Sequence, residues 1–384
     1  MEAKQLETTL QEADGLLKEG YYDQALEALS GLDEDSEAGG LIACMKGCAF
    51  LQLEQDEQAH LCFGAALDKG FVNKELYINL GIVKSRIGNY KQAEQMFRQA
   101  ADLDPVDALP LNRIILLRLG RGDFAGAEAV MDELMRRNPE LVDGYHHKAD
   151  LLLGTSRAEE ALQLLAGVEN RFSANSLYVY DLCRALRRTG RAQEALSYLN
   201  EHAGAFREEA DAVLLLKQQA SLLVELERAE EAEPIWQKLY ELYGDRQAGM
   251  ALAAGALAGG DMEALGRIAD EMTAAGVEDD SHYMCLYYKA LALRRQGDEA
   301  GAAEALRAAA EQFDLLERGA KSMRLRSLRA MIRLELGRYE EALADVDSLL
   351  ALAHESGGGE KIAATAKKLE ELGEIIRSRM NSFE

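Results

Sequence analysis

Apolar and small residues recur along most of the chain at spacings of three and four residues, in short segments that polar turns separate. The stretch from Leu76 to Pro105 carries this pattern most clearly, with a break at Gly88 and Asn89. Its apolar and small positions are Tyr77, Leu80, Gly81, Tyr90, Ala93, Phe97 and Ala100. Such spacings place side chains on one face of a helix, whereas glycine-rich breaks and proline end helices. The stretch therefore predicts a helix, a tight turn and a second helix.

A small residue near the start of the second helix marks the repetition of this unit along the chain. Alanines stand 34 residues apart at Ala25, Ala59, Ala93, Ala127, Ala161 and Ala195. The spacing then loosens to 37, 33, 37 and 40 residues, which gives Ala232, Leu265, Ala302 and Ala342. A fixed period of this length is typical of repeat proteins. The markers predict ten helix pairs, of which the first six are in strict register.

The order aromatic, Leu-Gly, Gly-x-Tyr, Ala, Phe, Ala, Pro in residues 76–105 resembles the tetratricopeptide repeat (TPR), whose period is 34 residues. The resemblance implies an all-α fold, a right-handed superhelical solenoid of about ten TPR-like helix pairs. After the loop at 354–360, one apolar stripe predicts a C-terminal capping helix over 360–384. The stripe consists of Ile362, Ala366, Leu369, Leu372, Ile376 and Met380.

The regularity of the repeats divides the chain into three parts. Residues 1–244 are predicted to form a regular TPR array of about seven repeats, and residues 245–353 degenerate TPR-like repeats. Residues 245–276 are rich in alanine and glycine. Because glycine lowers helix propensity and leaves thin packing, this segment is predicted to be a flexible joint. Residues 360–384 form the cap.

The charge and the cysteines narrow the class of protein. With 43 basic and 67 acidic residues the net charge is -24, which disfavours binding to nucleic acid or to an anionic membrane. No apolar run approaches the roughly 18 residues of a membrane span, and the amino terminus lacks the regions of a signal peptide. We therefore expect a cytoplasmic protein. Its 5 cysteines are expected to be reduced thiols in a packed interior.

The TPR resemblance implies that the first helices of successive pairs line a concave groove, which binds an extended peptide or a helix of a partner. Amides, charges and an aromatic side chain suit recognition of a peptide backbone and its side chains. A solvent-facing helix side without binding function would carry a similar mixture. Counting from the markers, the predicted groove residues are Asn79, Asn112, Arg113, His146, His147, Tyr180, Arg184 and Lys217.

A carboxylate clamp of the kind found in chaperone-binding TPR domains is incomplete in this sequence. Asn79 and Arg113 match the clamp of that subclass, but Cys44, Cys48 and Leu109 stand where its Lys, Asn and Lys would be. The resemblance therefore implies the fold and a binding role, and it disfavours a heat-shock co-chaperone.

Two clusters of possible metal ligands have simpler interpretations. Asp143, His146, His147 and Asp150 share one helical face, so they would suit a divalent metal or a proton-sensitive pair. The alternative is that neighbouring carboxylates hold two histidines in a polar groove. Cys44 and Cys48 lie on a different helix from His60 and Cys62, so these four are not expected to converge on zinc. We expect no metal site and no cofactor.

Two basic stripes interrupt the acidic background. They would receive an acidic segment of a partner or a run of RNA phosphates, or they pair with acidic helices on adjacent repeats. The stripes are Arg184, Arg187, Arg188 and Arg191, and Lys321, Arg324, Arg326, Arg329 and Arg333.

No phosphate loop, zinc-protease motif or nucleophile elbow occurs in the sequence, so the chain is not expected to be an enzyme. The sequence favours a non-enzymatic scaffold or adaptor that binds a protein or peptide partner. The alternative is a ligand- or metal-responsive regulatory protein that acts through another protein. The oligomeric state is left open.

Overall fold

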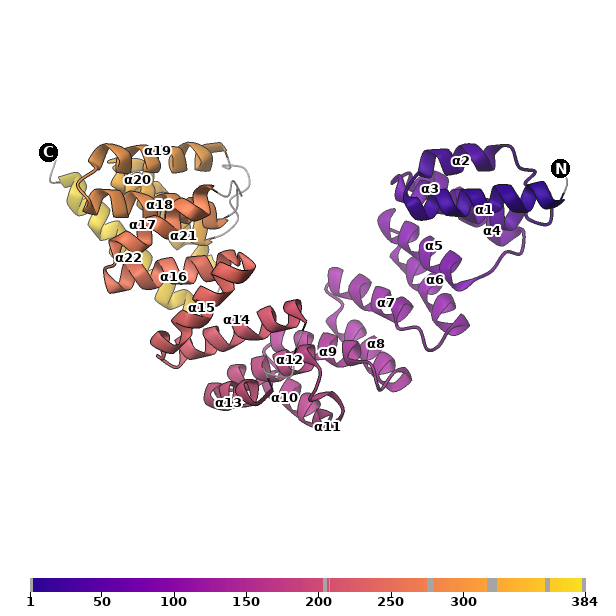
Figure 1. Cartoon of the computed structure of the whole chain (residues 1–384), viewed down its shortest axis with the longest axis horizontal. Coiled ribbons are helices and arrows are strands. Elements are labelled where there is room, and N and C mark those ends of the chain that lie inside the picture. Colours follow the sequence, from indigo (N-terminus) through magenta and orange to yellow (C-terminus); the bar gives the residue numbers. More distant parts are fainter. Residues whose placement is uncertain are drawn as a thin grey trace. The chain divides into compact units, whose positions relative to one another are not determined.

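The chain is built entirely from α-helices in the part of it that the structure describes. The computed structural model describes residues 3–202, 206, 208–274, 280–315, 323–355 and 360–381. These residues form 22 helices and no strand (Figure 1). The all-α prediction is confirmed.

Successive helices pair as antiparallel hairpins, and ten such pairs are followed by a last helix, as predicted. The first helices are α1 (Ala3–Glu19), α3 (Gly39–Gln52), α5 (Lys74–Arg86), α7 (Leu109–Gly120), α9 (Val142–Gly154), α12 (Ser176–Arg188), α14 (Glu209–Glu225), α16 (Arg246–Gly259), α18 (Asp280–Arg295) and α20 (Met323–Glu335). The second helices are α2 (Tyr22–Ser30), α4 (Asp56–Asp68), α6 (Tyr90–Leu103), α8 (Phe124–Arg137), α10 (Ala158–Ala166), α13 (Ala192–His202), α15 (Ala229–Tyr243), α17 (Met262–Ala274), α19 (Glu299–Leu315) and α21 (Tyr339–Glu355). A short α11 (Glu169–Phe172) lies between α10 and α12, and α22 (Glu360–Asn381) ends the series.

The marker residues lie where the two helices of a pair cross. Nine of the ten are 0% exposed and the tenth, Ala232, is 1% exposed. A small side chain lets two helix backbones approach closely. In the third pair, the space beside Gly81 of α5 is filled by the ring of Phe97 of α6, since a Cβ added to Gly81 would lie 2.5 Å from Cε1 of that ring. Gly47 and Phe63 repeat this contact one period earlier, at 2.6 Å.

The turn inside each pair ends on a residue with left-handed backbone conformation. Glycine supplies it at Gly88, where φ is 81°, and at most of the equivalent positions. In three pairs the same position holds Glu54, Ser156 or Glu227, with φ of 58°, 62° and 60°. Residues with a Cβ adopt this conformation at an energetic cost of roughly 1–2 kcal/mol. The turn geometry is therefore imposed by the packing of the helices it joins.

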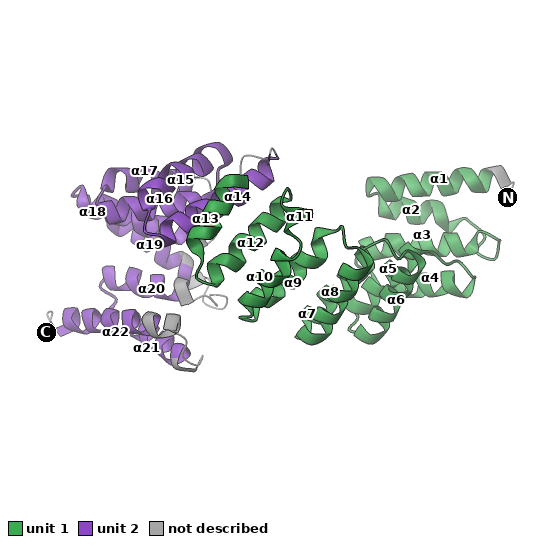
Figure 2. Cartoon of the chain, turned by 90° about the horizontal axis from the view of Figure 1, so that it is seen from below, with its two compact units in different colours: residues 1–205 green, residues 206–384 purple. Residues whose placement is uncertain are grey.

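The contacts divide the chain into two compact units, residues 1–205 and 206–384 (Figure 2). Unit 1 holds α1 to α13 and unit 2 holds α14 to α22. The predicted change from regular to degenerate repeats after residue 244 concerns the regularity of the repeats and stays a prediction. So does the flexible joint at 245–276, of which the last two residues lie outside the described part.

The last helix packs on the pair before it. Leu369 and Ile376 of α22 join a buried cluster with Val346 and Leu349 of α21. The described side chains of the stripe that predicted a capping helix, from Ala366 to Met380, are thus on the face that α22 buries, and the side chain of Ile362 lies outside the described part. All five cysteines are free thiols: three are buried, and Cys48 and Cys62 are half-buried. Among the described helices, none is long and apolar enough to cross a membrane.

Candidate peptide-binding surface

Seven of the eight predicted groove residues belong to first helices of unit 1. Asn79 lies on α5, and the other six are distributed in pairs over α7, α9 and α12. In Figure 1 these three helices lie on one side of the stack, and α8, α10 and α13 on the other. The first-helix face is the name used below for the surface formed by Asn79, Asn112, Arg113, His146, His147, Tyr180 and Arg184.

A charged network joins α9 to α12 at the end of this face nearest α13. His146 Nδ1 lies 2.7 Å from Asp181 Oδ2. Arg184 donates to Asp181 Oδ1 at 3.3 Å and to Asp150 Oδ1 at 2.9 Å. The guanidinium of Arg184 also lies over the ring of Tyr180, 5.3 Å from its centroid. The network therefore ties two successive repeats together.

The side chain of Asp181 is 1% exposed, so its charge must be satisfied internally. The hydrogen bond to Asp181 raises the pKa of His146 above its ordinary value, which favours the imidazolium that the buried carboxylate needs. Burial lowers the pKa of His147, and the charge of His146 lowers it further. The pKa values of the two neighbouring imidazoles are thus shifted in opposite directions, because only His146 has the buried carboxylate as its hydrogen-bond partner.

The partner of His146 comes from the next repeat and not from its own helix, where Asp143 and Asp150 had been grouped with it. Of the two interpretations of this cluster, histidines held by carboxylates agrees with the contacts of His146. No group of three or more His, Cys, Asp or Glu side chains is arranged to hold a metal ion within the described ranges. Counting by the period also places Asp181 on this face, although it was not among the eight residues predicted to bind. Its signal was the period, because it stands 34 residues after His147.

Asn79 and the cysteines of α3 form a second contact between repeats. Asn79 Nδ2 donates to Cys48 Sγ at 3.4 Å, so this amide already has a protein partner. The hydrogen bond with Cys44 lowers the pKa of Cys48. His60 Nε2 lies 3.3 Å from Lys84 Nζ, so its contact is with a cation and not with the thiols.

In the middle of the first-helix face, on α7, the side chains are exposed or lack a polar partner in the described chain. Arg113 is exposed, and no ion pair or hydrogen bond engages it among the residues that the structure describes. Leu109 and Leu116 lie one turn on either side of it and are 43% and 53% exposed. The amide oxygen of Asn112 is buried without a hydrogen-bond partner. These four residues, at spacings of three and four, share one side of α7.

Lys217, the eighth predicted residue, lies on α14 in unit 2. Its ammonium pairs with Asp245, the residue that caps the N-terminus of α16. Its charge is therefore satisfied within unit 2. The prediction that Lys217 contributes to the same groove as the other seven stays untested.

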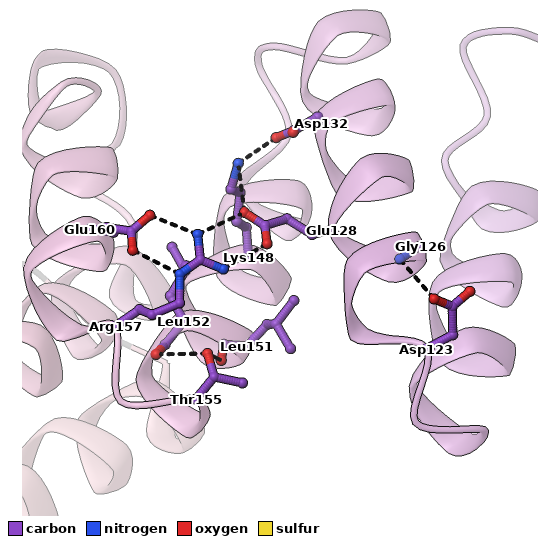
Figure 3. A network of polar contacts seen from close by, with 10 residues as sticks. All are labelled: Asp123, Gly126, Glu128, Asp132, Lys148, Leu151, Leu152, Thr155, Arg157 and Glu160. Carbon is purple, nitrogen blue, oxygen red and sulfur yellow. Dashed lines mark hydrogen bonds and ion pairs between the residues drawn. The ribbon is translucent and has the colours of Figure 1, made fainter.

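The opposite side of unit 1 is covered by ion pairs between neighbouring pairs of helices. Figure 3 shows Arg157 between two carboxylates, with distances of 2.7 Å to Glu128 and 2.7 Å to Glu160. Lys148 of α9 lies 2.5 Å from Asp132 of α8 in the same network. Acidic and basic side chains on this side thus contact one another.

Arginines of both basic stripes also contact carboxylates. Arg191 contacts Glu194 at 2.6 Å, and Arg329 and Arg333 contact Asp345 at 2.6 and 2.9 Å. These three arginines have acidic partners, but each partner belongs to the arginine's own helix pair and not to an adjacent repeat. Lys321 lies outside the described residues.

Ten hairpins of antiparallel helices, with equivalent residues of successive hairpins in contact, define a helical-repeat protein. Residues 74–107, which span α5 and α6, match the family model described as "Tetratricopeptide repeat". This match confirms the tetratricopeptide repeat that the sequence pattern predicted in residues 76–105. Repeats of this family generally mediate protein–protein interaction. No curated protein matches the chain in sequence.

Several solved structures resemble the chain at low sequence identity. Yeast Tom70 is 11% identical, with a TM-score of 0.48 over 99% of this chain and 97% of that chain. The C-terminal part of a TPR repeat-containing protein from Cytophaga hutchinsonii is 14% identical, with a TM-score of 0.49 over 63% of this chain and 99% of that chain. A tetratricopeptide repeat protein from Parabacteroides merdae is 14% identical, with a TM-score of 0.44 over 76% of this chain and 98% of that chain.

Proposed function

We propose that the chain is a non-enzymatic interaction scaffold or adaptor, which binds a peptide or helix of a partner protein on the first-helix face of unit 1. The observation that carries the proposal is the surface of α7. There Arg113, exposed and without an ion pair in the described chain, stands between the exposed Leu109 and Leu116. Exposed apolar side chains around an unpaired cation are typical of a surface that a partner covers.

The surroundings of α7 support binding with little reorganisation. On one side Asn79 is held by Cys48, and on the other His146 and Arg184 are held by the buried Asp181. Side chains that are already fixed lose little conformational freedom when a partner binds.

The test is affinity capture from a cell extract, at low and at moderate salt, with the full chain as bait. The groove variant carries Asn79→Ala, Asn112→Ala and Arg113→Ala. A control variant carries comparable changes, two amides and one arginine to alanine, at exposed positions of the second helices α6 and α8. The control changes are Gln92→Ala, Gln95→Ala and Arg136→Ala. Circular dichroism establishes first that both variants are folded.

We expect a partner protein that the wild type and the control variant retain and that the groove variant loses. The loss should be larger at low salt than at moderate salt, because salt screens the charge of Arg113 that the variant removes, whereas the apolar contacts of Leu109 and Leu116 remain in all three chains. Equal retention by all three chains would refute the first-helix face as the binding surface. Capture of no protein by the wild type would refute the scaffold function.

A further inference from the structure

An open cavity lies between the first helices of the first two pairs, α1 and α3, within unit 1. Its volume is about 420 Å³. Four of its lining side chains are apolar and three are polar or acidic, and none is basic. The lining residues are Leu6, Glu7, Leu10, Gln11, Asp14, Leu41 and Met45.

The apolar floor of the cavity is the edge of the core of the first pair. Met45 is 8% exposed and belongs to the buried cluster that Ala13 and Leu29 also form. Leu6, Leu10 and Leu41 pack against that cluster but remain partly exposed. α1 therefore has an apolar stripe wider than α2 and α3 cover. A ligand side chain that entered the cavity would cover the remaining apolar surface and lose its own water.

The rim of the cavity is acidic. Glu7 and Asp14 stand seven residues apart, two turns of α1 or roughly 10 Å along its axis. Glu7 is exposed and has no ion pair in the described part of the chain. Asp14 contacts Lys18 at 2.5 Å, but the two side chains are 54% and 74% exposed, so the pair is weak and can be exchanged.

We propose that this cavity binds a segment of a partner protein that presents large aliphatic side chains flanked by Lys or Arg. The apolar floor takes the aliphatic side chains, and the carboxylates of Glu7 and Asp14 receive the flanking cations. An acidic segment is rejected by the same two carboxylates. The inference rests on the proposed function, to which it adds a place on the array and a chemical class of partner.

The test uses a fluorescein-labelled probe peptide with the sequence GSKLLKSGS and the full chain, with fluorescence anisotropy as the readout. Two comparison peptides keep its length: GSELLESGS reverses the charges, and GSKSSKSGS removes the leucines. The cavity variant of the protein is Glu7→Lys with Asp14→Lys. The control variant is Glu12→Lys with Glu19→Lys, which has the same spacing and the same change of net charge on another side of α1, where both residues are exposed.

We expect the cavity variant to bind the probe at least about tenfold more weakly than the wild type, and the control variant to bind it within about twofold. Both comparison peptides should bind more weakly than the probe to the wild type. An equal loss in the two variants would reduce the effect to net charge and overturn the inference. Failure of the wild type to bind the probe, or equal binding of GSELLESGS, would overturn it as well.

Failure of this inference and failure of the proposed function give different results. In one outcome the wild type does not bind the probe but captures a partner that the Asn79→Ala, Asn112→Ala, Arg113→Ala variant loses. The scaffold function then stands, and the cavity is not a binding site for this class of segment. In the other outcome the wild type binds the probe at the cavity but captures no protein. This result would refute the scaffold function and the assignment of a protein segment as the occupant.

Discussion

The contact between Gly81 and Phe97 leaves no room for a methyl group, and this makes Gly81→Ala a sharp test of the packing. A Cβ at residue 81 would lie 2.5, 2.7 and 2.9 Å from three atoms of the Phe97 ring, which is itself 2% exposed. Alanine in a helix interior is more favourable than glycine by roughly 1 kcal/mol. Overpacking of a core costs about 1–3 kcal/mol. Because the ring is enclosed, the upper end applies, and Gly81→Ala should destabilise its pair by about 2 kcal/mol.

Gly64→Ala on α4 provides a matched control. Gly64 also lies inside a helix of unit 1, but a Cβ there would have no neighbour within 4 Å. Only the propensity term applies, so the control should stabilise its helix by roughly 0.5–1 kcal/mol. The same substitution is thus expected to change stability in opposite directions at two positions.

Hydrogen exchange followed by mass spectrometry measures the effect locally, because the stability of a repeat array is set by each repeat and its neighbours. Amides of α5 and α6 should exchange faster in Gly81→Ala and those of α4 more slowly in Gly64→Ala. A double variant, Gly81→Ala with Phe97→Leu, should be no less stable than Phe97→Leu alone, since the smaller side chain removes the clash. Slower exchange of α5 in Gly81→Ala would refute the assigned packing.

Three further outcomes follow from single contacts. The pKa of His146, measured by NMR titration, should lie above its ordinary value of about 6.5 and fall in the Asp181→Asn variant. Because the folded state has the raised pKa, the contact stabilises the protein fully below about pH 6.5 and less as the pH rises through the folded pKa. A wild type whose stability in urea depends on pH no more than that of the variant would contradict this. Glu54→Gly should stabilise unit 1 by about 1 kcal/mol in urea unfolding, and Gly88→Ala should destabilise it by a similar amount, because both residues have positive φ; the same sign for both would be inconsistent with that geometry. Asp345→Ala should cost about 3 kcal/mol in the unfolding of unit 2 because it removes the carboxylate that the mostly buried Arg329 and Arg333 share, whereas a loss below about 1 kcal/mol would show the pairs to be solvated.

The helix pairs could be predicted from the sequence because the signals that define them are local. A small residue at each crossing, as at Ala93, and a turn that needs positive φ, as at Gly88, recur with the period and act within one pair. The turns at Glu54 and Ser156 show where these local signals fail. There the helices on both sides impose a conformation that the residue itself does not favour, so the glycine signal is missing although the turn is present.

The contacts between repeats were harder to predict because they depend on which side chains reach across. Counting placed His146 and Arg184 on the correct helices, but Asp181, which holds both, appeared only as one polar residue among many. Its role depends on burial, which the period alone does not reveal. Lys217 was placed by the same counting where the spacing of the markers had already loosened to 37 residues, and its contact with Asp245 has no counterpart in the strict repeats.

The predicted groove residues therefore differ in what they can offer a partner. Arg184 already has two carboxylates, and a ligand would have to compete with both of them, so its replacement should weaken the array before it weakens binding. Arg113 has no such partner in the described chain, and its replacement should leave stability unchanged within about 0.5 kcal/mol. Residues of one pattern and one face thus separate into those that hold the repeats together and those free to bind. An internal partner, and not exposure alone, decides between the two.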